Sequence, residues 1–169
     1  MLDFGDLKAV AKKVCKNLNE HFICPIHSDV IDISDDENGM NVNLVCEDGS
    51  KFSIPKSDCA MLPIVHSTVE ELAIYLWGKI LLELNAKYLR MRGIHTMQVT
   101  CSEATGQEAV FRMEIPDSDD DADIEKVCDV KSYIMTGELL PKPCLPVDKT
   151  GGASLETKGE SSCCHQCGK

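Results

Sequence analysis

The stretch HSTVEELAIYLW, from His66 to Trp77, decides the fold because it starts a helix that is apolar on more than one side. Ser67 and Glu70 have capping-box spacing, in which a hydroxyl and a carboxylate each satisfy a free backbone donor at a helix start. The apolar positions form a main stripe and an off-stripe group: Val69, Leu72, Ala73, Leu76, Ile80 and Leu84, then Ile74, Leu81 and Leu82. The pattern predicts a helical region that ends at Gly93, covered by a sheet on one side and by a helix or another subunit on another.

Alternating residues on both sides of this helix predict strands. Residues 40–55 (MNVNLVCEDGSKFSIP) read as a hairpin around an Asp48-Gly49 turn, and a further strand begins near 30–33. After the helix, residues 97–101 and 109–113 alternate on either side of SEATGQ, which predicts a second antiparallel pair. Before all of these, an apolar stripe at helical spacing predicts a surface helix that bears Leu7, Val10, Ala11, Val14 and Leu18.

Composition excludes several classes of function. The chain has 169 residues and a formal net charge of −11, which disfavours binding to nucleic acid or to anionic lipid. Its apolar stretches are shorter than a membrane span, and its start is amphipathic where a signal peptide would be apolar. We therefore expect a cytoplasmic protein. The cysteines up to Cys144 are scattered singly, which favours reduced thiols, with Cys15, Cys46 and Cys101 as core residues.

The composition changes after Pro116. An acidic run, DSDDDAD, and a tail with little apolar periodicity predict a mostly disordered segment over 117–169, apart from a short amphipathic turn near 124–135. We therefore expect a folded domain over 1–116. Near the end, Cys164 and Cys167 form a knuckle, but a zinc site normally closes with a second knuckle, so exposed thiols are the preferred interpretation.

Three stretches carry a family resemblance. Residues 1–8 (MLDFGDLK) resemble the "GMVxDFxxLK" entry to the first helix of the 6-pyruvoyl tetrahydropterin synthase family. Residues 66–77 are similar to that family's "STTENxAxYIW" second helix, and residues 99–104 (VTCSEA) resemble its "VxVxET" strand. The resemblance implies an α+β T-fold (tunnelling fold) subunit, with an antiparallel sheet, two helices on one face and assembly into a homo-oligomer.

The resemblance also implies chemistry and site residues. The family's synthase removes triphosphate from 7,8-dihydroneopterin triphosphate and then moves protons along the side chain to form a diketone. Glu103 matches the glutamate that anchors the pterin, and Thr68 and Val69 match the substrate-binding start of the second helix. Glu20 and His21 stand where the family has an acid-paired histidine that transfers protons. The alternatives are a surface glutamate for Glu103 and a solvent-facing pair for Glu20 and His21.

The chain also departs from the family. Zinc is the implied cofactor, but the family's zinc-binding histidines lie on a first hairpin that precedes the matching part of this chain. His27, His66 and His95 do not reproduce their spacing. An extra hairpin, about 29–55, separates the two helices. We therefore expect a T-fold subunit that lacks the first hairpin and the zinc ligands, either as an incomplete chain or as a zinc-less homologue.

Three functions are consistent with this sequence. The first is a 6-pyruvoyl tetrahydropterin synthase-type lyase in tetrahydrobiopterin biosynthesis. The second is a 6-carboxy-tetrahydropterin synthase-type enzyme of queuosine biosynthesis, because the first reaction step and the pterin anchor are shared. The third is a non-catalytic pterin-binding or assembly subunit, which the missing ligands favour. A small-molecule pterin is the expected partner in each case.

Overall fold

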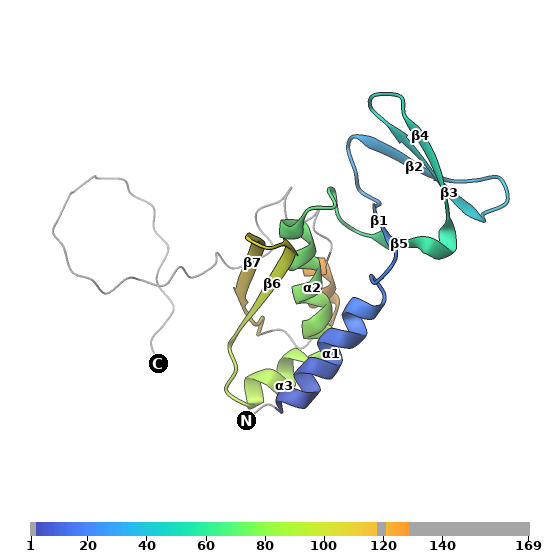
Figure 1. Cartoon of the computed structure of the whole chain (residues 1–169). Coiled ribbons are helices and arrows are strands. Elements are labelled where there is room, and N and C mark those ends of the chain that lie inside the picture. The colour runs from blue at the N-terminus through green and yellow to red at the C-terminus, as the bar shows by residue number, and fades with distance from the viewer. Residues whose placement is uncertain (1–2, 118–120, 129–169) are drawn as a thin grey trace, which may run out of the picture.

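The computed structural model describes residues 3–117 and 121–128, and its elements are labelled in Figure 1. In chain order they are α1 (Phe4–Lys16), β1 (Phe22–Pro25), β2 (Ile31–Asp35), β3 (Asn41–Cys46), β4 (Lys51–Pro55), a 3-10 turn (Lys56–Asp58), β5 (Cys59–Leu62), α2 (Val69–Leu84), α3 (Ala86–Met91), β6 (Thr96–Ala104), β7 (Gln107–Glu114) and α4 (Asp121–Cys128). The predicted α+β class is confirmed. None of the described helices has the length and hydropathy needed to cross a bilayer.

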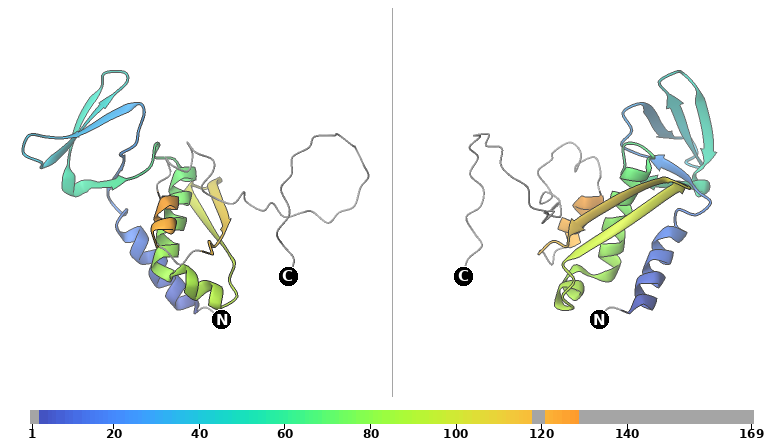
Figure 2. Two further views of the ribbon diagram at one scale, coloured as in Figure 1. Left: turned by 180° about the vertical axis from the view of Figure 1, so that it is seen from behind. Right: turned by 60° about the vertical axis from the view of Figure 1, so that its left-hand side comes forward.

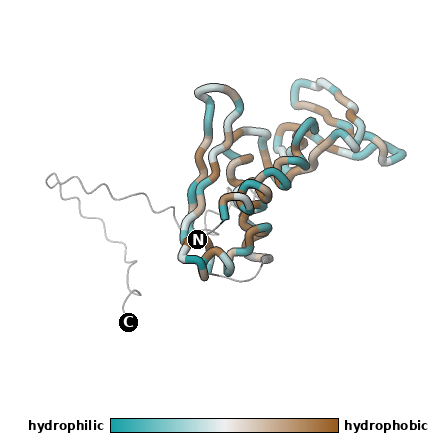
Figure 3. The backbone as a smooth tube through the Cα atoms, turned by 60° about the horizontal axis from the view of Figure 1, so that its bottom comes forward, coloured by the Kyte–Doolittle hydropathy of each residue, from teal (hydrophilic) through white to brown (hydrophobic). Residues whose placement is uncertain are grey.

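The core is built around α2, which packs against one face of the β6–β7 hairpin. Trp77 is fully buried, its Nε1 donates to the Met97 carbonyl oxygen at 2.9 Å, and its ring meets Phe111 edge-on with centroids 5.8 Å apart. The hairpin pairs Met97 with Met113 and Val99 with Phe111, so the apolar side chains share the helix-facing side. Figure 3 shows this alternation of hydropathy along the two strands.

Two other helices cover the remaining sides of α2. α1, whose Val14 is buried, packs along it, and α4 packs on it through Ile124 and Cys128. Figure 2 shows α1 and α4 beside α2 from two directions. The prediction that α2 is covered on more than one side is therefore confirmed, and part of the cover comes from α4, a segment that the sequence analysis placed in the tail.

The small parallel pair β1–β5 separates two hydrophobic clusters. Ile23, Ala60 and Leu62 belong to the main core around α2. Cys24 and Cys59 belong to a second cluster with the inner face of an antiparallel sheet in the order β2-β3-β4. That sheet, which projects from the helical body in Figure 1, contains the predicted β3–β4 hairpin with its Asp48-Gly49 turn. The predicted extra hairpin is thus a three-stranded sheet with its own core.

The structure differs from the sequence prediction in four local features. The long helical region breaks at Asn85, which adopts φ 64°, and so forms α2 and α3. The N-cap of α2 is Thr68, one residue later than expected. Cys15 is exposed, because it lies off the buried stripe of α1, while Cys46 and Cys101 are half-buried. Within the stretch expected to be mostly disordered, α4 overlaps the predicted amphipathic turn at 124–128. The Cys164 knuckle and the rest of the tail lie outside the described residues.

Gly78 permits the close approach of α4 to α2. A Cβ built at this position would lie 2.5 Å from the Cys128 sulfur, which is closer than real Cβ contacts. Burial also raises the pKa of the Cys128 thiol to about 11, so at neutral pH this group is a protonated packing residue. Substitutions at Gly78 and Cys128 can therefore test whether α4 packs against α2 as part of the fold.

We predict that the clash introduced by Gly78→Ala lowers the free energy of unfolding by about 1–3 kcal/mol. The better helix propensity of Ala offsets about 1 kcal/mol of this loss. Cys128→Ala removes the clashing sulfur. The two changes should therefore couple by about 0.5–3 kcal/mol in a double-mutant cycle measured by urea unfolding. Effects that add without coupling would show that α4 does not pack against Gly78 in solution.

Candidate functional site

An open groove of about 570 Å³ lies between the N-terminus of α2 and the turn of the β6–β7 hairpin. Its lining residues are Ser67, Thr68, Val69, Glu70, Glu103, Gly106, Gln107 and Glu108. The groove therefore brings together the three residues that the sequence predicted to bind substrate: Thr68, Val69 and Glu103. Glu103 lies at least 34 positions along the chain from the other two residues, which are adjacent.

Glu103 reaches the groove because of its position in β6. Met97, Val99 and Cys101 pack against the helix-facing core, and the alternation of the strand puts Glu103 on the same side. A β-bulge interrupts the pairing at this point: Ser102 pairs with Glu108 and Ala104 with Gln107, so Glu103 has no partner in the register. Bulges commonly re-aim a side chain beside a functional site. Since α2 begins only at Val69, Glu103 lies beyond the cover of the helix and is exposed to the groove.

The opposite wall is the segment that leads into α2. Thr68 caps the helix by accepting a hydrogen bond from the Glu71 backbone N–H, at 3.4 Å from Oγ1. Val69, the first helical residue, is half-buried. Ser67, the predicted N-cap, instead donates from Oγ to the Ile23 carbonyl oxygen at 3.1 Å. This bond ties the groove wall to β1.

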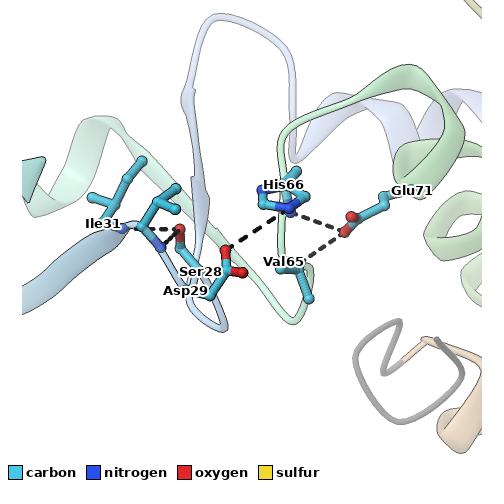
Figure 4. A network of polar contacts seen from close by, with 7 residues as sticks. Ser28, Asp29, Ile31, Val65, His66 and Glu71 are labelled. Carbon is cyan, nitrogen blue, oxygen red and sulfur yellow. Dashed lines mark hydrogen bonds and ion pairs between the residues drawn. The ribbon is translucent and has the colours of Figure 1, made fainter. Parts of the chain in front are cut away.

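A network of polar contacts fixes the approach to this wall, as Figure 4 shows. The Oε2 atom of Glu71 accepts hydrogen bonds from the backbone N–H groups of Val65, at 2.7 Å, and His66, at 3.0 Å. The His66 ring lies 3.8 Å from the Asp29 carboxylate, measured from Nε2 to Oδ1. The network therefore joins the start of α2 to the segment that enters β2.

Glu20 and His21, the predicted proton-transfer pair, are exposed and lie in the turn between α1 and β1, outside the groove lining. Glu20 adopts φ 60°, which is uncommon for a residue other than glycine. The His21 Nδ1 lies 2.7 Å from the Asn19 carbonyl oxygen. Because a carbonyl only accepts, Nδ1 carries the proton in the neutral ring, and Nε2 is left as the basic nitrogen. The His21 ring is thus paired with a backbone carbonyl, whereas the resemblance implies an acidic partner.

Among residues 3–117 and 121–128, no group of three or more His, Cys, Asp and Glu side chains is arranged to hold a metal ion. The described residues therefore do not fit the zinc ion that the family resemblance implies. The thiols of Cys24, Cys59 and Cys101 have raised pKa values, chiefly because burial disfavours the thiolate. Such thiols are poor nucleophiles and poor bases near neutral pH.

The charge of the groove limits what it can bind. Among the residues that the structure describes, its lining carries three carboxylates, from Glu70, Glu103 and Glu108, and no cationic side chain. Carboxylates accept hydrogen bonds, so the groove suits a neutral ligand with N–H donors better than an anion. Glu70 and Glu108 were not predicted as groove residues. Glu108 accepts a hydrogen bond from the Ser102 hydroxyl at 3.2 Å. The only sequence signal for Glu70 and Glu108 is their proximity in the chain to Val69 and Glu103.

Comparison with known proteins gives the family of the chain. No protein-family model matches the chain. Among curated proteins, it is 29% identical over 110 residues to a Methanocaldococcus jannaschii protein assigned as a 6-carboxy-5,6,7,8-tetrahydropterin synthase, covering 65% of this chain and 64% of that protein. The chain thus spans somewhat less than two thirds of this relative.

Two solved structures are more similar in sequence. The 6-pyruvoyl tetrahydropterin synthase of Plasmodium falciparum is 38% identical, with a TM-score of 0.65, over 68% of this chain and 69% of that chain. The Plasmodium vivax enzyme is 39% identical, with the same TM-score and the same coverage. The mixed α+β fold agrees with this likeness. The chain belongs to the family of the 6-pyruvoyl and 6-carboxy tetrahydropterin synthases and has their T-fold.

Proposed function

We propose that this chain binds the pterin ring in the groove and is a subunit of a 6-pyruvoyl tetrahydropterin synthase-type lyase that acts on 7,8-dihydroneopterin triphosphate. One observation carries the proposal. Thr68, Val69 and Glu103, selected from two separate motifs, line a single groove. Their convergence supports a common ligand, because neither motif alone predicts where the other lies.

The chemistry of the groove suits one end of this substrate. The amidine edge of a pterin presents adjacent N–H donors, and the two oxygens of the Glu103 carboxylate accept them as a bidentate pair. Glu103 lies across the groove from the start of α2. The free backbone N–H groups and the dipole at a helix start favour a nearby negative charge, which here is the Glu103 carboxylate. The triphosphate must extend away from the groove, since Glu70 and Glu108 would repel it.

We assign proton transfer to His21. Its Nε2 is the basic nitrogen of the neutral ring, and imidazole can accept and return a proton near neutral pH. The left-handed conformation of Glu20 agrees with a functional turn, because uncommon backbone conformations cluster at such sites. β1 begins at Phe22, directly after His21, and its Ile23 carbonyl accepts the Ser67 hydroxyl, so β1 connects the turn that bears Glu20 and His21 to the groove wall.

A second candidate is a 6-carboxy-tetrahydropterin synthase-type activity, which the Methanocaldococcus jannaschii relative favours. Both activities need the same pterin anchor, so the groove supports them equally. Mass spectrometry of the product formed from 7,8-dihydroneopterin triphosphate separates them. A pyruvoyl side chain supports the first proposal, and a 6-carboxylate supports the second.

We predict that neopterin binds to this chain and that Glu103→Gln weakens its binding roughly ten- to a hundredfold. The change keeps the shape of the side chain but replaces one acceptor with a donor that faces the N–H groups of the pterin, at a cost on the order of 1.5–3 kcal/mol. Fluorescence titration measures the affinity. Glu114→Gln, on the same hairpin but at the end opposite the turn, is the control and should leave the affinity unchanged. Equal affinities for wild type and Glu103→Gln would remove the support for a pterin site.

A further inference from the structure

Glu71 is the one charged side chain among the described residues that is buried, with 6% of its surface exposed. Burying a carboxylate is costly unless hydrogen bonds compensate for the lost water. Here two backbone N–H groups do so, from Val65 and His66, and both bonds end on the same atom, Oε2. The Glu71 carboxylate therefore binds one backbone turn, at residues 65–66.

The geometry of Glu71 differs from an ordinary capping box. In that motif the N3 carboxylate returns to the backbone N–H of the N-cap residue, which here is Thr68. Glu71 does occupy N3, but its carboxylate reaches farther back, to residues 65 and 66. It therefore fixes the direction from which the chain enters the helix, in addition to the helix end itself.

The turn that Glu71 holds comes directly before the groove wall. Residues 67–70 line the groove, and the two residues that Glu71 binds precede them without a gap. Other contacts restrain the same segment from outside: Ser67 bonds to β1, and His66 lies beside Asp29. Figure 4 shows that Glu71 approaches the turn from the helix and Asp29 approaches it from the β2 side. The segment is thus held between two elements.

We propose that Glu71 is a positioning residue for the pterin groove: its Oε2 atom holds the 65–66 turn and so sets the wall formed by Thr68 and Val69. This inference rests on the proposed function, because the groove is assigned to a pterin. The role depends on the position of one acceptor oxygen, Oε2, and does not depend on the negative charge of the carboxylate. That distinction can be tested with two conservative substitutions.

Glu71→Gln keeps the length of the side chain and a carbonyl oxygen that can accept both bonds, but it removes the charge. Glu71→Asp keeps the charge but withdraws the oxygens by one methylene. We expect Glu71→Gln to bind neopterin within about threefold of wild type and Glu71→Asp to bind roughly tenfold or more weakly. Glu83→Asp, on the exposed side of the same helix, is the matched control and should bind as wild type does. The reverse order, with the Asp variant strong and the Gln variant weak, would overturn the inference, as would equal affinity in both variants.

A second measurement keeps this test separate from the pterin assignment. Hydrogen exchange of the Val65 and His66 amides, followed by NMR, should remain slow in wild type and Glu71→Gln and become at least about tenfold faster in Glu71→Asp, because an opened bond exposes the amide. If wild type binds no neopterin, the proposed function fails, and this exchange pattern alone decides whether Glu71 holds the wall. Slow exchange in all three proteins would overturn the positioning role.

Discussion

The constraint on which this structure depends is that α2 has too little polar surface to face water. Nine of its sixteen residues are buried, and they include Trp77, Leu81 and the glycine at 78. Each large apolar side chain that is buried contributes about 1.5–3 kcal/mol, so a helix of this composition must be covered on several sides. The β6–β7 hairpin, α1, α4 and the β1–β5 pair all contribute to that cover. Their positions around α2 bring its N-terminus to the hairpin turn, and the groove forms where the cover ends.

The elements that could be predicted from sequence are those specified by local patterns. α2 follows from its apolar periodicity, and the β3–β4 and β6–β7 hairpins follow from alternation around turn residues such as Gly49, which has φ 83°. The parallel β1–β5 pair could not be predicted in this way. Its strands have four residues each, and the three-stranded sheet separates them, so neither carries a periodic signal of its own. Their pairing depends on tertiary contacts with both clusters.

The residues that line the candidate groove could also be predicted in part. Thr68, Val69 and Glu103 were identified by motif, whereas the geometry that joins them depends on features without a sequence signature. One is the bulge that leaves Glu103 unpaired. Another is the one-residue shift of the N-cap from Ser67 to Thr68, which frees the Ser67 hydroxyl to bond to β1. Serine and threonine cap helices almost equally well, so only tertiary contacts could decide between them. Glu71 acquires its role from that same shift.

We propose that the groove is a pterin-binding surface whose two walls come from one buried helix and one bulged strand. A crystal structure of this chain with neopterin tests it most directly. We expect density for the pterin in the groove, with its amidine edge within hydrogen-bonding distance of both Glu103 carboxylate oxygens and its ring beside Thr68 and Val69. A pterin bound elsewhere on the chain, with this groove occupied only by water, would contradict it.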